Sequence, residues 1–242
     1  MVSFDAGRQR VTMRPAHLGL LGMLVEEPGA ATALPGIAEL RAAGLVVGDL
    51  PAREVAELLD AIAHARLRVE VETSAGARVD RHTVWLAGGM GVSAEARPGG
   101  EYDYAAVPPA LLPFALARIV NLQPRPDPAR APVVVARRAI DQLSVGEAGL
   151  DGEDAGMIAW LVREHRLSWR MTSVWIDPAG DRQVAELTVV DAMEAGLWIA
   201  SLPQDPDYAD PELPVTLTPC ASRDVWNRIV GLLPNPWGQG RS

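Results

Sequence analysis

The chain has 242 residues, of which 48% are hydrophobic and 22% charged, so it is long and apolar enough to bury a sizeable core. Its net charge is -9, and its 22 basic residues are all arginines without a clustered run, which argues against nucleic acid and anionic lipid as partners. The lack of lysine excludes P-loop, Schiff-base and Ser-Lys chemistry, and the single cysteine, Cys220, excludes an internal disulfide or a multi-thiolate metal site.

The N-terminal stretch MVSFDAGRQRVTM has no apolar region of signal-peptide length, and no apolar run reaches the length of a membrane span. We therefore expect a cytoplasmic protein without membrane insertion.

Three helices are predicted in the first quarter of the chain. Residues 14–27 and 35–45 carry apolar residues at helical spacing, and Gly44 marks the end of the second helix. Residues 51–65 begin with a proline and carry a longer apolar stripe, as is typical of an amphipathic helix. That stripe consists of Val55, Leu58, Leu59 and Ile62.

A meander of three strands is predicted next. Residues 66–72, RLRVEVE, alternate apolar and charged side chains, the pattern of a strand with one buried face. Residues 78–87 and 91–96 predict two further strands, and GGMG at 88–91 predicts the hairpin turn between them rather than a phosphate loop, because no helix follows it. Residues 107–122 then predict a helix with its prolines confined to the first turns.

The second half repeats this order. Residues 133–143 predict a short helix and residues 153–166 a longer one. The predicted strands are 166–176, 183–192 and 196–202, with a turn at DPAGD, 177–181, after the first. A final helix is predicted to begin with Thr218 as its N-cap and Pro219 at its first position, and to stop at Pro234.

Two similar nonapeptides close the two halves. RIVNLQPRP at 118–126 and RIVGLLPNP at 228–236 are identical at six of nine positions. We interpret them as the ends of corresponding helices in an internal duplication, with a first half at 11–126, a second half at 133–236 and a linker at 126–132. The predicted fold is a single α+β domain over 1–242, in which two helix-meander-helix halves related by a pseudo-two-fold axis form one central twisted antiparallel sheet with flanking helices.

Motifs for catalysis, metal binding or cofactor binding are not evident in the sequence. His64 and His165 both precede an Arg-Leu pair that opens a strand, where a cation favours a helix C-terminus, so capping or surface roles are expected. No zinc-binding histidine spacing and no nucleophile elbow occur. The acidic stretch 204–212 is expected to be a solvated loop. We expect no enzyme activity, no metal and no cofactor.

Two alternatives remain open at the level of the sequence. Residues 38–46 resemble the end of a helix in winged-helix transcriptional regulators, although no basic recognition face accompanies them. An enzyme of unrecognised class would require a polar cleft with perturbed titrating groups. DNA binding at low salt would support the first alternative, and such a cleft the second.

The tryptophans lie unevenly along the chain: Trp85 alone is in the first half and six are in the second. Most are expected in the core, but a partly exposed tryptophan is a favoured anchor at protein interfaces. A tryptophan that faces a partner is therefore the alternative to a core role for all of them.

In the order and spacing of its segments, the chain resembles the EspG family, the cytosolic chaperones of actinobacterial type VII (ESX) secretion systems. The segments that carry the likeness are AELRAAGLVVGD at 38–49, RLRVEVE at 66–72, DPAGDR at 177–182, GLWIASLP at 196–203 and VWNRIVGLLP at 225–234. The resemblance implies a quasi-two-fold fold without catalysis that binds the apolar tip of a PPE protein in its PE/PPE heterodimer. It implies that the client is kept from aggregating and is released for export; a WXG-type helical hairpin is the other client considered.

Residues of the client site follow only from this resemblance. In the family a long loop between the second and third strands contacts the client, whereas the connection at 88–90 is short here, which leaves Met90 as the candidate of the first half. The family's other contact region maps onto Trp198, Trp226, Ile229 and Leu233. A homodimer formed through an edge strand is also compatible with the sequence.

Overall fold

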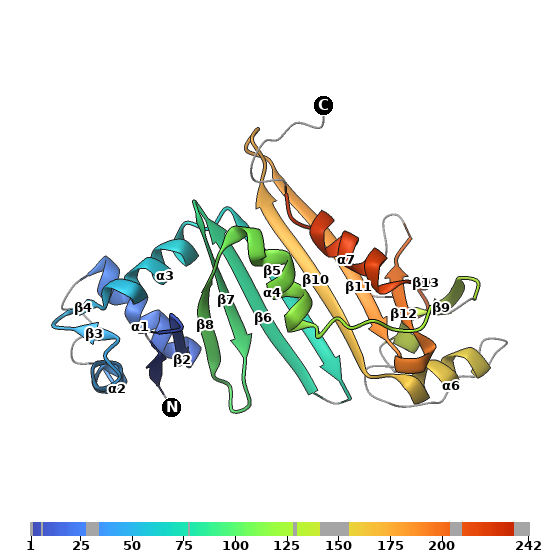
Figure 1. Ribbon diagram of the computed structural model, residues 1–242, viewed down its shortest axis with the longest axis horizontal. Helices are drawn as coiled ribbons and strands as arrows, with labels where there is room; N and C mark the ends of the chain where they lie inside the picture. Colours follow the sequence, from blue (N-terminus) through green and yellow to red (C-terminus); the bar gives the residue numbers. More distant parts are fainter. Residues whose placement is uncertain are drawn as a thin grey trace. The chain divides into compact units, whose positions relative to one another are not determined.

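The computed structural model describes residues 2–5, 7–27, 34–76, 78–127, 130–140, 155–203 and 210–234 (Figure 1). The chain divides into two compact units, which are treated separately. The first unit comprises Met1–Val69, His82–Ala115 and Val174–Gln183, and the second comprises Glu70–Arg81, Leu116–Ser173 and Val184–Ser242. Strands β5, β6, β10 and β11 therefore contribute residues to both units.

The first unit has the strand order β1-β2-β8-β7-β6-β5 and three N-terminal helices. Strand β1 pairs with β2, β2 with β8, β8 with β7 and β7 with β6, and all four pairings are antiparallel. The strands are β1 (Ser3–Asp5), β2 (Arg10–Met13), β5 (Leu67–Ala75), β6 (Arg78–Ala87), β7 (Met90–Ala96) and β8 (Tyr102–Val107), and the helices are α1 (Pro15–Glu26), α2 (Ile37–Ala42) and α3 (Arg53–Ala63).

The core of the first unit lies between its helices and the face of β2, β7 and β8. Leu21 of α1, Leu40 of α2 and Val55 of α3 are fully buried there together with Val11 and Val92 from the strands. These helical residues belong to the apolar stripes that the sequence shows, so the burial of each stripe explains why the segment is helical. Small strands β3 (Val46–Val47) and β4 (Leu50–Pro51) form a separate antiparallel hairpin between α2 and α3.

The second unit has the strand order β5-β10-β11-β12-β13-β9. Its core gathers apolar residues from α6, from the short helix η2 and from the last strands, among them Leu161, Val190, Trp198 and Leu217. The short helix η1 (Pro109–Leu111) belongs to the first unit, and α4 (Leu112–Ile119) begins there and ends in the second. The other elements of the second unit are β9 (Val133–Ala136), α6 (Ala155–Glu164), β10 (Leu167–Ile176), β11 (Arg182–Asp191), η2 (Met193–Ala195), β12 (Leu197–Ser201), β13 (Pro214–Cys220) and α7 (Ser222–Gly231).

Several predicted local features are confirmed. Leu67, Val69 and Val71 of β5 are buried while Arg68 and Glu70 are exposed, as the alternation predicts. Gly88 and Gly89 form a two-residue hairpin turn, with Ala87 opposite Met90 and a positive φ of 57° at Gly88 that favours glycine.

The ends of three helices also agree with the sequence. Gly44 stops α2 with a φ of 75°, and the N–H of Leu45 donates to the carbonyl of Leu40 at 2.9 Å, a common C-terminal capping arrangement. Helix α4 ends at Ile119 and α7 at Gly231, so each nonapeptide contains the end of a helix. The internal duplication itself stays a prediction.

The predicted three-stranded meanders are wrong in both halves, because each contains a fourth strand, β8 in the first and β13 in the second. Strand β13 includes Pro219, although the sequence pattern predicts this proline at the start of the last helix. Pro219 lies opposite Trp198 of β12, beyond the Pro214–Leu217 segment that pairs with β9. Because β13 is not paired with β9 at this position, no hydrogen bond to β9 requires the N–H that proline lacks. Helix α7 accordingly begins at Ser222, after Ala221, and Thr218 is not its N-cap.

Residues 133–143 also depart from the prediction of a helix. Val133–Ala136 form strand β9, whose β-branched residues pair with β13, and helical structure begins only at residues 137–140. The rest of that segment and the acidic residues 204–209 lie outside the described residues. The segments 53–119 and 155–231 each run helix, four strands, helix apart from short 3-10 turns, whereas the half-turn relation between the halves stays a prediction.

Candidate functional site

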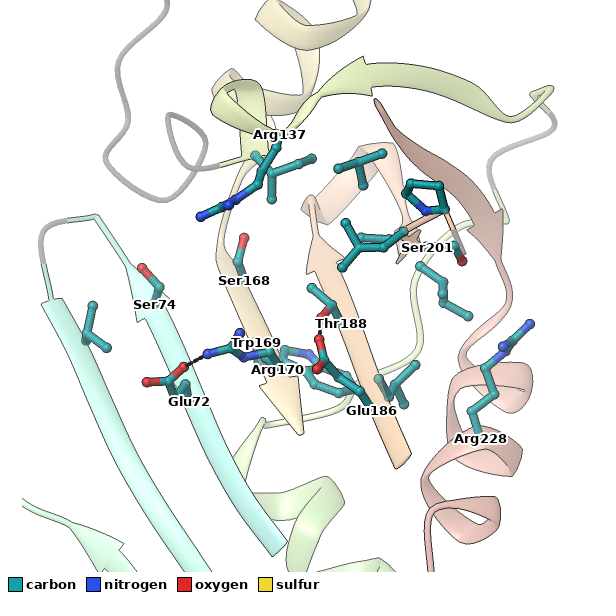
Figure 2. Close-up of a pocket in the computed structure, with 18 of the residues that line it drawn as sticks. Glu72, Ser74, Arg137, Ser168, Trp169, Arg170, Glu186, Thr188, Ser201 and Arg228 are labelled. Carbon is teal, nitrogen blue, oxygen red and sulfur yellow. Dashed lines mark hydrogen bonds and ion pairs between the residues drawn. The ribbon is translucent and has the colours of Figure 1, made fainter. Parts of the chain in front are cut away.

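A groove of about 830 Å³ lies in the second unit and is the main concave feature among its described residues (Figure 2). Its wall is built by β5, β6, β10, β11 and β12, with contributions from residues 137 and 140, from β13 and from α7. Its volume falls in the range typical of small-molecule sites, or of a site for a few side chains of a protein partner.

Period-two alternation along the strands creates the polar part of the wall. Glu72 and Ser74 of β5 line the groove, whereas Val71 and Thr73 between them are buried on the other face. Glu186 and Thr188 line it in the same way on β11. Glu72, the last charged residue of RLRVEVE, is therefore part of the wall of a groove.

Glu72 joins two arginines across this wall. It accepts a hydrogen bond from Nε of Arg81 at 2.8 Å and another from Arg170 of β10, which Figure 2 shows as a dashed line. The hydrogen bond from Arg81 lowers the pKa of Glu72, partial burial opposes this, and Arg170 lowers the pKa further. The glutamate thus stays ionised and ties β5 to β10 within this unit.

Apolar residues form the other part of the wall. Ile199 and Val215 are buried, and Ile140 and Leu202 are half-buried and pack against the core of the second unit. Leu202 is followed by the exposed Pro203, also in the lining. The groove therefore combines a charged side with an apolar side.

A second charged cluster fixes the segment that follows α4. The carboxylate of Asp191, at the end of β11, accepts hydrogen bonds from Nε of Arg125 and Nε of Arg166, both at 2.8 Å. Ser222 adds to this anchor, since its hydroxyl donates to the carbonyl of Gln123 at 3.0 Å and accepts from the N–H of Arg125 at 3.1 Å. The cluster is structural: it ties residues 123–125 to β10, β11 and α7.

The pKa of Asp191 reflects two opposing causes. Burial alone would raise it, because a charged carboxylate loses its hydration. The hydrogen bonds and positive charges of Arg125 and Arg166 outweigh burial and lower the pKa below its ordinary value. Asp191 is therefore ionised and paired at neutral pH.

The predicted partner residues do not lie together on the groove. Trp198 is 0% exposed, and its indole N–H donates to the carbonyl of Ala195 at 2.8 Å. Ile229 is equally buried on α7. Neither side chain offers surface to a partner, because both are packed into the interior, and they take no part in the contact surface proposed below.

The other three predicted residues are half-buried. Trp226 and Leu233 belong to α7 and the residues after it, and Met90 packs against the core of the first unit. None of the three lines the groove. Sequence reasoning missed the groove residues because they come from strands far apart in the chain, and its nearest signal was the charged alternation of 66–72.

The histidines take different roles. His64 is the C-cap residue of α3, and its ring Nδ1 lies 3.1 Å from the carbonyl of Asp60, which confirms the predicted capping position. His165 is half-buried, and its Nε2 lies 2.9 Å from the hydroxyl of Ser168. Burial lowers the pKa of His165, so it is not the charged surface cap that its position suggests.

Within the described ranges, no three histidine, cysteine, aspartate or glutamate side chains come together as a metal site would require. Over the same residues, no helix has both the length and the apolar character needed to cross a bilayer.

Comparison with known proteins gives a match at the level of structure. No protein-family model matches the sequence, and no curated protein matches it. The structure is similar to that of the Mycobacterium tuberculosis type VII secretion system chaperone EspG5, solved in complex with a PE25-PPE41 dimer. The similarity covers 93% of this chain and 97% of that chain, with a TM-score of 0.60 and 17% sequence identity. The chain therefore has an EspG-like mixed α+β fold, with a large antiparallel sheet and flanking helices.

Proposed function

We propose that this chain is a cytosolic chaperone of a type VII-like secretion system, which binds an apolar surface of a helical client and keeps the client from aggregating before export. The observation that carries the proposal is the near-complete structural match to a chaperone solved with its PE25-PPE41 partner. The match covers almost the whole of both chains. It therefore indicates a shared overall architecture rather than one small shared module.

Two properties of the chain support a binding role. The groove presents an apolar side on which a client side chain could be buried. The net charge of -9 keeps copies of the chain apart, as suits a protein that covers an apolar patch without aggregating itself. The proposal assigns the chain no catalytic step, and its clients are PE/PPE-like heterodimers or WXG-type hairpins.

Co-expression tests the proposal. Genes for small helical secreted proteins encoded near the gene for this chain would be expressed with and without it. We expect at least one client to move from the pellet to the soluble fraction and to elute with the chain in size-exclusion chromatography. The proposal fails if every such client has the same solubility and elution with and without the chain.

A further inference from the structure

The groove of the second unit carries an excess of positive charge in an acidic protein. Four arginines line it, Arg81, Arg137, Arg170 and Arg228, against two glutamates, whereas the whole chain has a net charge of -9. Because this local positive charge is opposite in sign to the net charge of the chain, it favours an anionic partner at the groove.

Both glutamates of the groove already have partners. Glu72 already accepts hydrogen bonds from Arg81 and Arg170. Glu186 accepts a hydrogen bond of 3.4 Å from the hydroxyl of Thr188. Among the described residues, Arg228 has no ion-pair partner, and its side chain extends from α7 on the side of the groove away from Glu72 in Figure 2.

Apolar surface is available in the same groove. Leu202 and Pro203, which follow β12, lie in the lining together with Ile199 of β12. A partner that excludes water from this surface would gain binding free energy by burying an apolar side chain there. Guanidinium groups beside it would hold a carboxylate with directional hydrogen bonds.

We infer that this groove binds a segment of the client in which a carboxylate stands beside an apolar side chain, the carboxylate at Arg228 and the apolar side chain against Leu202 and Pro203. The partner is a protein segment, and its identity as a secretion client rests on the proposed function. The requirement for a carboxylate follows from the charge of the groove and not from the resemblance in fold.

A peptide selection tests the chemistry of the groove without knowledge of the client. The purified chain is immobilised and used to select from a library of helix-forming peptides, with an unrelated acidic domain as the background. We expect enriched peptides to carry Asp or Glu within one helical turn of Leu, Ile or Phe. Enrichment of peptides without a carboxylate, or no enrichment above the background, overturns the inference.

Matched variants locate the binding. Arg228→Glu should weaken the selected peptides by about tenfold or more, whereas Arg223→Glu, on the same helix but outside the groove, should change their affinity by less than about twofold. Leu202→Asp should weaken them similarly, and Val184→Asp should not, because Val184 is 55% exposed on β11 and does not line the groove. Equal effects within either pair overturn the assignment to this groove.

The co-expressed client separates this inference from the proposed function. If a client binds the native chain and Arg228→Glu alike, the inference fails and the chaperone role stands. If no client binds but acidic, apolar peptides are selected and depend on Arg228, the chaperone role fails and the chemistry of the groove stands.

Discussion

Asp191 holds the segment after α4 in place through two arginines. Its carboxylate is 1% exposed and accepts hydrogen bonds from Arg125 and Arg166. Replacing it with asparagine leaves two guanidinium groups without their counter-charge, so Asp191→Asn should lower the free energy of unfolding by about 3 kcal/mol or more. Urea denaturation followed by circular dichroism measures this.

The control is Asp181→Asn in the exposed turn between β10 and β11, where only backbone groups of Asp181 are hydrogen-bonded. It should change the free energy of unfolding by less than about 0.5 kcal/mol. A similar small change in Asp191→Asn would show that the cluster does not stabilise the fold.

The same carboxylate predicts a dependence of stability on acid. The pKa of Asp191 in the folded chain lies below its ordinary value of 3.8, so its contribution is present above that value. The contribution is lost as pH falls through the folded-state pKa, because the carboxylate must then take up a proton. Urea midpoints of the native chain and of Asp191→Asn should therefore differ at neutral pH and converge at the most acidic pH. A constant difference would contradict the assignment.

At the scale of elements, Gly91 allows β7 to approach its neighbours closely. A Cβ at this position would lie 2.8 Å from the carbonyl oxygen of Val107 and 2.9 Å from Cδ2 of Leu112. Gly91→Ala should therefore destabilise the first unit by about 1–3 kcal/mol. Thermal unfolding compares it with Gly89→Ala, which meets no atom within 4 Å. Equal midpoints for both variants would contradict this packing.

Elements with a long periodic pattern could be predicted from the sequence. Helix α3 and strand β5 follow directly from their apolar spacing, because burial of one stripe or one face decides each structure. Strand β13 could not be predicted in the same way, since its prolines at 214 and 219 are typical of helix starts or loops. Only the limited pairing with β9 explains why a strand tolerates Pro219.

The candidate groove could likewise be predicted only in part from the sequence. Its polar wall is visible in the alternation of 66–72, but its assembly depends on pairing between strands that the sequence does not align. The expectation for Trp198 differs from the structure in the opposite direction. A tryptophan on a strand is expected to contact a partner protein, yet its indole N–H donates to the carbonyl of Ala195 inside the core. Exposure of a large side chain depends on tertiary packing, which periodicity alone does not describe.

At the scale of the whole molecule, the duplication predicts a measurable symmetry. Apart from short 3-10 turns, the segments 53–119 and 155–231 share the element order helix, four strands, helix. An experimental structure should allow residues 51–126 to be superposed on residues 153–236 by a rotation of about a half-turn, as in a closed two-fold arrangement. A best superposition by a clearly different rotation would contradict the duplication and leave the shared nonapeptide ends without this explanation.

The central claim is that the chain binds a helical client through the sheet face of its second unit. Hydrogen–deuterium exchange of the chain, free and in complex with a co-purified client, tests it most directly, because amides covered or stabilised by a partner exchange more slowly. The account predicts protection in β5, β10 and β12 around the groove and in α7 near Arg228, with the first three helices unchanged. A stable complex whose protection falls only on α1, α2 and α3 would contradict it.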